Sequence, residues 1–252
     1  MENELIGAAS IQIRPYRPAD RPSVRRICAD TGFLGSPIDP VFEDRELFAD
    51  YLTDYYLNRE PDATLVCEVD GIVAGYLLGC RRPFHNSVYQ ALANVAIAGK
   101  ALYRCIRRPY GRASRGFLRW ILTRARREVP AAPRLTPHFH LNLLPRARSI
   151  RGTRALIQAF LAFLHREGHE SVYGQMVTFG TRRHNRLFER FGFQVAERRE
   201  ITKYRGLHSE RVYLSTIIRD LRSGARLVSA HRVVQLEKTG RYLTTQTANG
   251  AQ

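Results

Sequence analysis

The sequence predicts a mixed α/β fold in which helices cover both faces of one central sheet. Three observations support this prediction. Short apolar runs of strand length alternate with segments whose apolar residues recur three and four positions apart. Two apolar runs are joined by Asp70-Gly71, a strong hairpin signal. The 252 residues are 44% hydrophobic and 25% charged, which suffices for one domain core with an insertion or a tail.

The first third of the chain predicts the order strand, helix, helix, strand, strand. Asp20 is the expected N-cap of the first helix, and Asp44 that of the second. A loop rich in Gly and Pro, residues 31–44, separates these helices. The predicted elements are a strand at 11–16, helices at about 20–29 and 45–58, and strands at 63–69 and 72–80.

The rest of the chain predicts a helical, basic stretch followed by alternating strands and helices. Two helices are expected to end at glycines, Gly168 and Gly192. The predicted elements are helix at 85–128, a strand at 138–144, a helix at 152–167, a strand at 171–178, a helix at 182–191, and strands at 193–204 and 211–219. We therefore divide the chain into an N-terminal segment (1–10), a domain (11–220) with a helical insertion (84–136), and a basic C-terminal tail (221–252).

Cysteine usage and the N-terminus predict a cytoplasmic protein. The four cysteines, Cys28, Cys67, Cys80 and Cys105, show no CxxC spacing and are expected to be reduced and mostly buried, with no metal site. The chain opens with the acidic sequence MENE and no apolar run follows, so we expect no secretory signal. No run of about 18 apolar residues predicts a membrane-spanning helix. Peripheral attachment to a membrane stays open.

Positive charge is concentrated in the predicted insertion. The formal net charge is +17 and the pI is about 10.5. Residues 81–130 contain eleven arginines and one lysine against a single acid, Glu128. Residues 88–106 are largely apolar, and 114–128 place arginines opposite an apolar stripe. Three interpretations remain: an anionic membrane surface, a nucleic acid or other acidic partner, or helices that pack over the sheet with solvated arginines.

The segment 143–156 (LLPRARSIRGTRAL) predicts an anion site. A strand ends in a turn rich in small and cationic residues, and the turn opens onto a helix. The first amides of a helix have no internal acceptor and carry partial positive charge, so phosphate is a natural ligand. Small residues allow close approach, and arginines add charge-assisted donors.

This segment and the order of elements resemble the GNAT (GCN5-related N-acetyltransferase) superfamily. In that family the turn reads Arg/Gln-x-x-Gly-x-Gly/Ala; Arg148 matches its first position, whereas Arg151 and Thr153 depart from it. The segment 181–193 (TRRHNRLFERFGF) resembles a second family motif, with Phe188 where many members have a tyrosine. The opening IRPY and PAD at 13–20 are also similar. Phe188 cannot protonate a leaving thiolate as that tyrosine is thought to do.

The resemblance implies that the chain binds acetyl-CoA or another acyl-CoA and transfers its acyl group to an amine attacking directly in a ternary complex. The residues that it implies for cofactor binding are Leu143, Leu144, Arg146, Arg148, Ser149, Ile150, Arg151, Gly152, Thr153, Thr181, Asn185 and Phe188.

Candidate catalytic side chains lie on the strand 138–144. Side chains alternate along a strand, so His138, His140 and Asn142 share one face. Imidazole suits proton transfer near neutral pH, which makes His140 or His138 the candidate general base. The alternative is a pair of histidines packed on the sheet with their nitrogens satisfied.

For the acceptor amine we predict the acidic loop residues Asp39 and Glu43, together with Asn142, as binding groups. Two other functions stay open: a GNAT-like module without catalysis that binds nucleic acid or anionic membrane, and an O-acyltransferase. The oligomeric state, monomer or homodimer, is also open.

Overall fold

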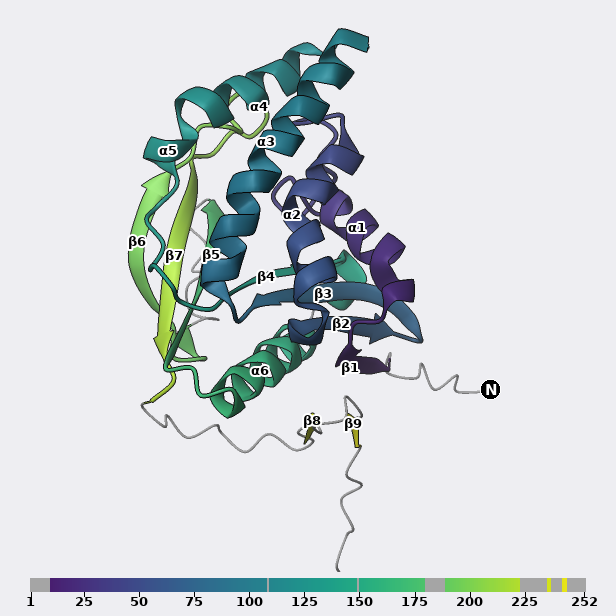
Figure 1. Ribbon diagram of the computed structural model, residues 1–252, viewed down its shortest axis with the longest axis vertical. Helices are drawn as coiled ribbons and strands as arrows, with labels where there is room; N and C mark the ends of the chain where they lie inside the picture. Colours follow the sequence, from purple (N-terminus) through teal and green to yellow (C-terminus); the bar gives the residue numbers. More distant parts are fainter. Residues whose placement is uncertain are drawn as a thin grey trace, which may run out of the picture.

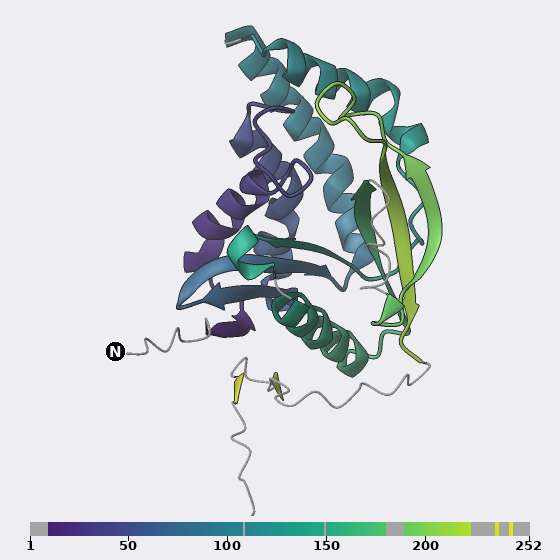
Figure 2. The same ribbon diagram turned by 180° about the vertical axis from the view of Figure 1, so that it is seen from behind.

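A computed structural model describes residues 10–107, 109–148, 150–179 and 189–222, and the backbone of two short strands further on. Seven strands form one sheet in the order β1-β2-β3-β4-β5-β7-β6. Helices lie on both faces of this sheet, with α6 on one side and α1, α2 and α3 on the other (Figure 1, Figure 2). The predicted mixed α/β architecture is therefore confirmed.

The elements follow the predicted order. The N-terminal half contains β1 (Ile11–Pro15), α1 (Arg21–Asp30), α2 (Arg45–Arg59), β2 (Thr64–Val69) and β3 (Ile72–Cys80). Between β3 and β4 come α3 (Pro83–Arg107), α4 (Arg112–Thr123) and α5 (Ala125–Glu128). The remainder contains β4 (His138–Leu143), α6 (Ile150–Arg166), β5 (Ser171–Phe179), β6 (Gln194–Glu200) and β7 (Val212–Asp220), with β8 (Gln235–Leu236) paired to β9 (Tyr242–Leu243).

Local signals in the N-terminal half behave as predicted, with one exception. Asp70 and Gly71 both have positive φ, 52° and 77°, as a tight two-residue hairpin turn requires. Asp44 caps α2 by accepting a hydrogen bond of 3.0 Å from the Leu47 amide. Asp20 lies at the N-cap position of α1 but makes no capping bond there. Its carboxylate instead accepts from Arg14 and from the Arg17 amide, so the predicted position is confirmed while the capping hydrogen bond is not made.

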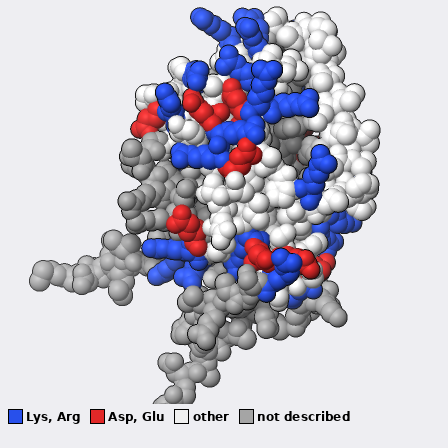
Figure 3. Space-filling model, turned by 90° about the vertical axis from the view of Figure 1, so that its left-hand side faces the viewer, with Lys and Arg blue, Asp and Glu red and all other residues white. Residues whose placement is uncertain are grey.

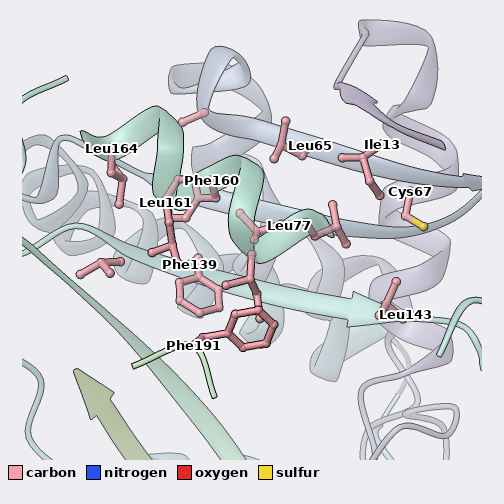
Figure 4. Close-up of a cluster of buried hydrophobic side chains, with 14 of the residues drawn as sticks. Ile13, Leu65, Cys67, Leu77, Phe139, Leu143, Phe160, Leu161, Leu164 and Phe191 are labelled. Carbon is pink, nitrogen blue, oxygen red and sulfur yellow. The ribbon is translucent and has the colours of Figure 1, made fainter. Parts of the chain in front are cut away.

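The larger core lies between the sheet and α6 (Figure 4). α6 directs a stripe of apolar residues toward the strands, and Phe160 contacts Phe139 of β4 with ring centroids 5.9 Å apart. A Cβ on Gly79 of β3 would lie 2.2 Å from the Phe160 ring. Glycine at this position therefore lets α6 lie close against the sheet. Gly168 has a φ of 78° just after α6, as the predicted C-terminal glycine of this helix should.

The opposite face of the sheet carries two smaller cores. One lies beneath α1 and α2, around Tyr56 and Tyr76. The other joins the loop between α1 and α2 to α3, α4 and the strands β5 and β7. α3 thus lies alongside α2, between α2 and the strands β5 and β7 (Figure 1). The helical stretch predicted at 85–128 is confirmed, and its inner side packs over the sheet.

Some predictions lie outside the described residues. These are the N-terminal segment except residue 10, most of the helix predicted at 182–191, and nearly all of the C-terminal tail. Of the four cysteines, three are buried and Cys105 is half-buried, all as free thiols. Among the helices that the structure describes, none has the length and hydropathy needed to cross a membrane.

Candidate active site

The sheet divides between β4 and β5. These parallel strands pair only at His138–Tyr173 and Phe139–Gly174 along their described lengths. Beyond those pairs β4 continues to Leu143 and β5 to Phe179, and the two strands diverge (Figure 1, Figure 2). We call residues 141–143 of β4 and 175–179 of β5 the open edge. Along the open edge β4 has no strand partner on its β5 side within the described residues.

The hydrogen bonds of β4 show which backbone groups face the open edge. The Leu144 amide donates to the Ala74 carbonyl of β3 at 2.8 Å, so it points away from β5 and is occupied. On the other side, the Tyr173 amide donates to the Pro137 carbonyl at 2.9 Å. Because backbone groups alternate along a strand, the amides of Leu141 and Leu143 are directed toward the open edge. Leu143 and Leu144 are both among the residues predicted for cofactor binding; the Leu143 amide is directed toward the open edge, and the Leu144 amide is not.

The start of α6 lies directly after the end of β4. A short turn, Pro145–Ala147, links the two, and the helix begins at Ile150. Arg146 and Arg151 are exposed, whereas Gly152 and Thr153 are buried. The first turn of the helix therefore presents its amides next to two exposed guanidinium groups. Ser149 and the side chain of Ile150 lie outside the described residues.

Arg148 connects this turn to the loop between α1 and α2. Its Nε donates to the Leu143 carbonyl at 2.9 Å, and its Nη2 donates to the Gly35 carbonyl. A Cβ on Gly35 would lie 2.7 Å from that guanidinium, and Gly35 has a φ of 90°. Arg148 therefore holds two segments together. The N–H groups of its guanidinium that are not used in these two hydrogen bonds are the ones that could donate to a phosphate.

His138, His140 and Asn142 share the sheet face that α1 and α2 cover, as the alternation predicts. His138 lies 2.9 Å from the Tyr56 hydroxyl through its Nε2, and the His140 ring packs edge-on against the same tyrosine at 5.4 Å. Asn142 donates to the Thr31 hydroxyl at 2.8 Å. The neighbours with opposite orientation, Phe139, Leu141 and Leu143, belong to the α6 core.

Burial determines the protonation of both histidines. It lowers the pKa of His140 to about 4. The pKa of His138 is lowered to about 3, by burial first and by the neighbouring His140 second. Both imidazoles are therefore neutral at pH 7, each with one unprotonated ring nitrogen. His140 is half-buried, and its imidazole makes no hydrogen bond within the described part of the chain.

The first turn of α3 closes this polar cluster. The Asn86 amide lies 3.4 Å from His138 Nε2. Asn86 Oδ1 and His138 Nδ1 are both buried without a hydrogen-bond partner among the described residues. Tyr173 packs on His138 with ring centroids 5.0 Å apart, and burial raises its pKa to about 12. Sequence reasoning missed Tyr56 and Asn86, because both come from elements far away in sequence.

The acidic residues predicted for the acceptor amine have partners within the protein. Asp39 forms an ion pair of 2.6 Å with Arg45. Glu43 accepts from the Gly111 amide, the N-cap residue of α4, at 3.2 Å. Glu43 thus binds the backbone at the start of α4, and neither side chain is brought next to His140 by any contact described. The predicted residues Thr181, Asn185 and Phe188 lie outside the described residues.

Comparisons with known proteins identify the fold. No protein-family model and no curated protein matches the sequence. Among solved structures, a protein named SsHAT is 24% identical over 84% of this chain and 98% of its own, with a TM-score of 0.54. The yncA protein of Salmonella typhimurium, solved with its cofactor acetyl-CoA, is 15% identical over 87% of this chain and 99% of its own, with a TM-score of 0.50.

A polyamine N-acetyltransferase of Drosophila melanogaster, which forms N-acetylagmatine, is also similar. It is 14% identical over 84% of this chain and 100% of its own, with a TM-score of 0.50. The chain therefore has the GNAT fold of these acetyltransferases, as the order of its elements predicts.

Proposed function

We propose that this chain is an acyl-CoA-dependent N-acyltransferase of the GNAT superfamily and that the open edge between β4 and β5 holds the acyl donor. The observation that carries the proposal is the divergence of two parallel strands right beside the start of α6. An elongated ligand that has amides at one end and phosphates at the other matches this arrangement. Acyl-CoA is such a molecule.

The residues at this place fit such a ligand group by group. The Leu141 and Leu143 amides face the open edge, where they can bind the amide carbonyls of the pantetheine arm. The helix start, with exposed Arg146 and Arg151, suits a diphosphate. Bound acyl-CoA would supply a thioester carbonyl for attack by an amine.

His140 is the proposed proton acceptor, acting directly or through water. A neutral imidazole with a pKa of about 4 is a weak base toward an ammonium group. It can still take a proton from the much more acidic nitrogen that forms when an amine has attacked a carbonyl. His138 is bonded to Tyr56 and is better suited to fixing the position of its neighbours. The acid that protonates the thiolate stays unassigned.

The cofactor assignment is tested by the melting temperature with coenzyme A. A ligand at about a hundredfold excess over its Kd adds about 2.7 kcal/mol to the free energy of unfolding. We expect coenzyme A to raise the melting temperature by several degrees, and Arg151→Glu or Arg148→Glu to abolish most of the rise. Arg166→Glu, at the other end of α6, is the matched control and should keep it. No shift for the wild type at millimolar coenzyme A contradicts the proposal.

The proposed base is tested by turnover of acetyl-CoA with a panel of amines, starting with agmatine because of the fly enzyme. His140→Ala should lower kcat by roughly 10²–10⁴-fold while the melting shift with coenzyme A persists. His165→Ala, an exposed position on α6, is the control. Unchanged turnover in His140→Ala removes this residue from the mechanism. Coenzyme A binding without turnover of any amine or hydroxyl favours a binding module without catalysis.

A further inference from the structure

The outer side of α3 carries an aliphatic ridge that is exposed in this structure. Val88, Leu92, Val95, Leu102 and Ile106 recur at helical spacing, with Gly99 completing the series. Their exposed fractions are 50%, 71%, 74%, 65% and 72%, and α3 contains no buried residue. Phe84, 64% exposed, extends the ridge to the start of the helix. A contiguous apolar surface of this kind marks an interaction site.

The inner side of α3 is also apolar. Ile97, Ala101 and Cys105 pack against the core shared with α4 and β7. Residues 83–99 contain no Lys, Arg, Asp or Glu. Between the ridge and this inner side α3 carries uncharged polar residues such as Gln90 and Asn94, whereas a surface helix normally turns a charged side outward. The ridge is therefore suited to a contact outside this chain.

Cationic residues begin where the ridge ends. Arg107 lies in the last turn of α3, and Arg112, Arg115 and Arg119 lie on the exposed side of α4. None of the four forms an ion pair with another described residue. Glu128, the single acid in residues 83–128 against nine arginines and one lysine, is engaged by Trp120 and Thr202. Figure 3 shows Lys and Arg atoms at the end of the molecule where α4 lies, and others interspersed with Asp and Glu over the rest of this face.

We propose that the ridge of α3 and the arginines of α4 together form a surface that docks on an anionic lipid bilayer. Apolar side chains enter the boundary between headgroups and acyl chains, and guanidinium groups meet the acidic headgroups beside them. The helix lies in the plane of the bilayer and does not cross it. This proposal is independent of the acyltransferase proposal.

Two other partners, a second copy of the chain and a nucleic acid, fit the ridge and the arginines less well. A second copy of the chain could match the helical spacing of the ridge, but pairing would bring two strongly cationic segments together. A nucleic acid would satisfy the arginines and leave the ridge uncovered. Bases stack on aromatic side chains, and the centre of the ridge from Val88 to Leu102 is aliphatic.

The test is co-sedimentation of the full chain with vesicles of phosphatidylcholine alone or mixed with phosphatidylserine. We expect binding to the mixed vesicles that weakens at high salt. The double variant Leu92→Ser, Leu102→Ser should lower the partition coefficient about tenfold or more. The double variant Arg115→Gln, Arg119→Gln should lower it about five-fold per arginine at low salt. Ile72→Ser and Arg26→Gln, at exposed positions elsewhere, are the matched controls and should bind as the wild type does.

Three results would overturn the proposal. One is that the wild-type protein does not co-sediment with anionic vesicles at low salt. Another is a dimer in solution that the two serine substitutions convert into a monomer, since a second copy would then cover the ridge. The last is a combination of two results: the wild type binds an oligonucleotide and the arginine substitutions abolish that binding, but neither double variant changes co-sedimentation with vesicles.

Discussion

The two longest helices on opposite sides of the sheet are built on different principles. α6 turns Leu156, Phe160 and Leu164 into the main core with at most 1% of their surface exposed, and carries polar residues on its outer side. α3 is longer, buries none of its residues and keeps large apolar side chains in solvent. The contrast teaches that apolar periodicity identifies a helix but does not say what covers it. Burial in the folded chain separates a structural helix from one suited to an external contact.

The largest expected effect concerns the aromatic side chains of these two helices. Phe160→Ala in α6 should lower the free energy of unfolding by roughly 3–5 kcal/mol, because it removes a buried ring and leaves a cavity next to Gly79. Phe84→Ala in α3 should change it by less than about 0.5 kcal/mol. Urea titration of both variants gives the comparison. Similar losses in the two would mean that the outer side of α3 is covered within the chain.

The second effect concerns pH and the histidines on the α3 side of the sheet. In the unfolded chain histidine binds a proton below a pKa of 6.5, whereas folded His140 does so near 4. Stability should therefore decrease as pH falls from 6.5 toward 4, by about 2 kcal/mol per histidine between pH 7 and 5. His140→Asn should remove about one histidine's share of that decrease. Unfolding curves of both proteins at the two pH values measure it, and parallel pH dependences would contradict the burial of this imidazole.

A smaller effect concerns the attachment of α3 to α2. Asp44 caps α2 and also accepts from Arg104 of α3 and, at 2.7 Å, from the Tyr110 hydroxyl. Asp44→Asn should cost about 1–2 kcal/mol at pH 7. Burial acts to raise the pKa of Asp44, but hydrogen bonds from Arg104 and Tyr110 outweigh it, so the pKa lies below 3.8. The wild type should lose the stability that the Asp44 carboxylate contributes as pH falls below 3.8. At such pH the difference in stability between the wild type and Asp44→Asn, measured by thermal unfolding, should vanish. A difference that persists in strong acid would exclude the carboxylate as its source.

Local sequence signals predicted most of the fold. The Asp70-Gly71 turn, the Asp44 cap and the alternation along β4 depend on residues close together in the chain, so a single sequence contains them. The arrangement of the candidate site depends on distant pairs. Tyr56 and His138 are 82 positions apart, and Arg148 and Gly35 are 113 apart. No local pattern could show that Arg148 already has partners, or that Asp39 and Glu43 would be used within the protein.

The division of the sheet has a mechanical consequence. Two pairs of residues are the direct link between β4 and β5 along their described lengths, so beyond them these two strands are joined only through the packing of side chains. A ligand that forms hydrogen bonds with both β4 and β5 along the open edge would connect the two strands where they do not pair with each other.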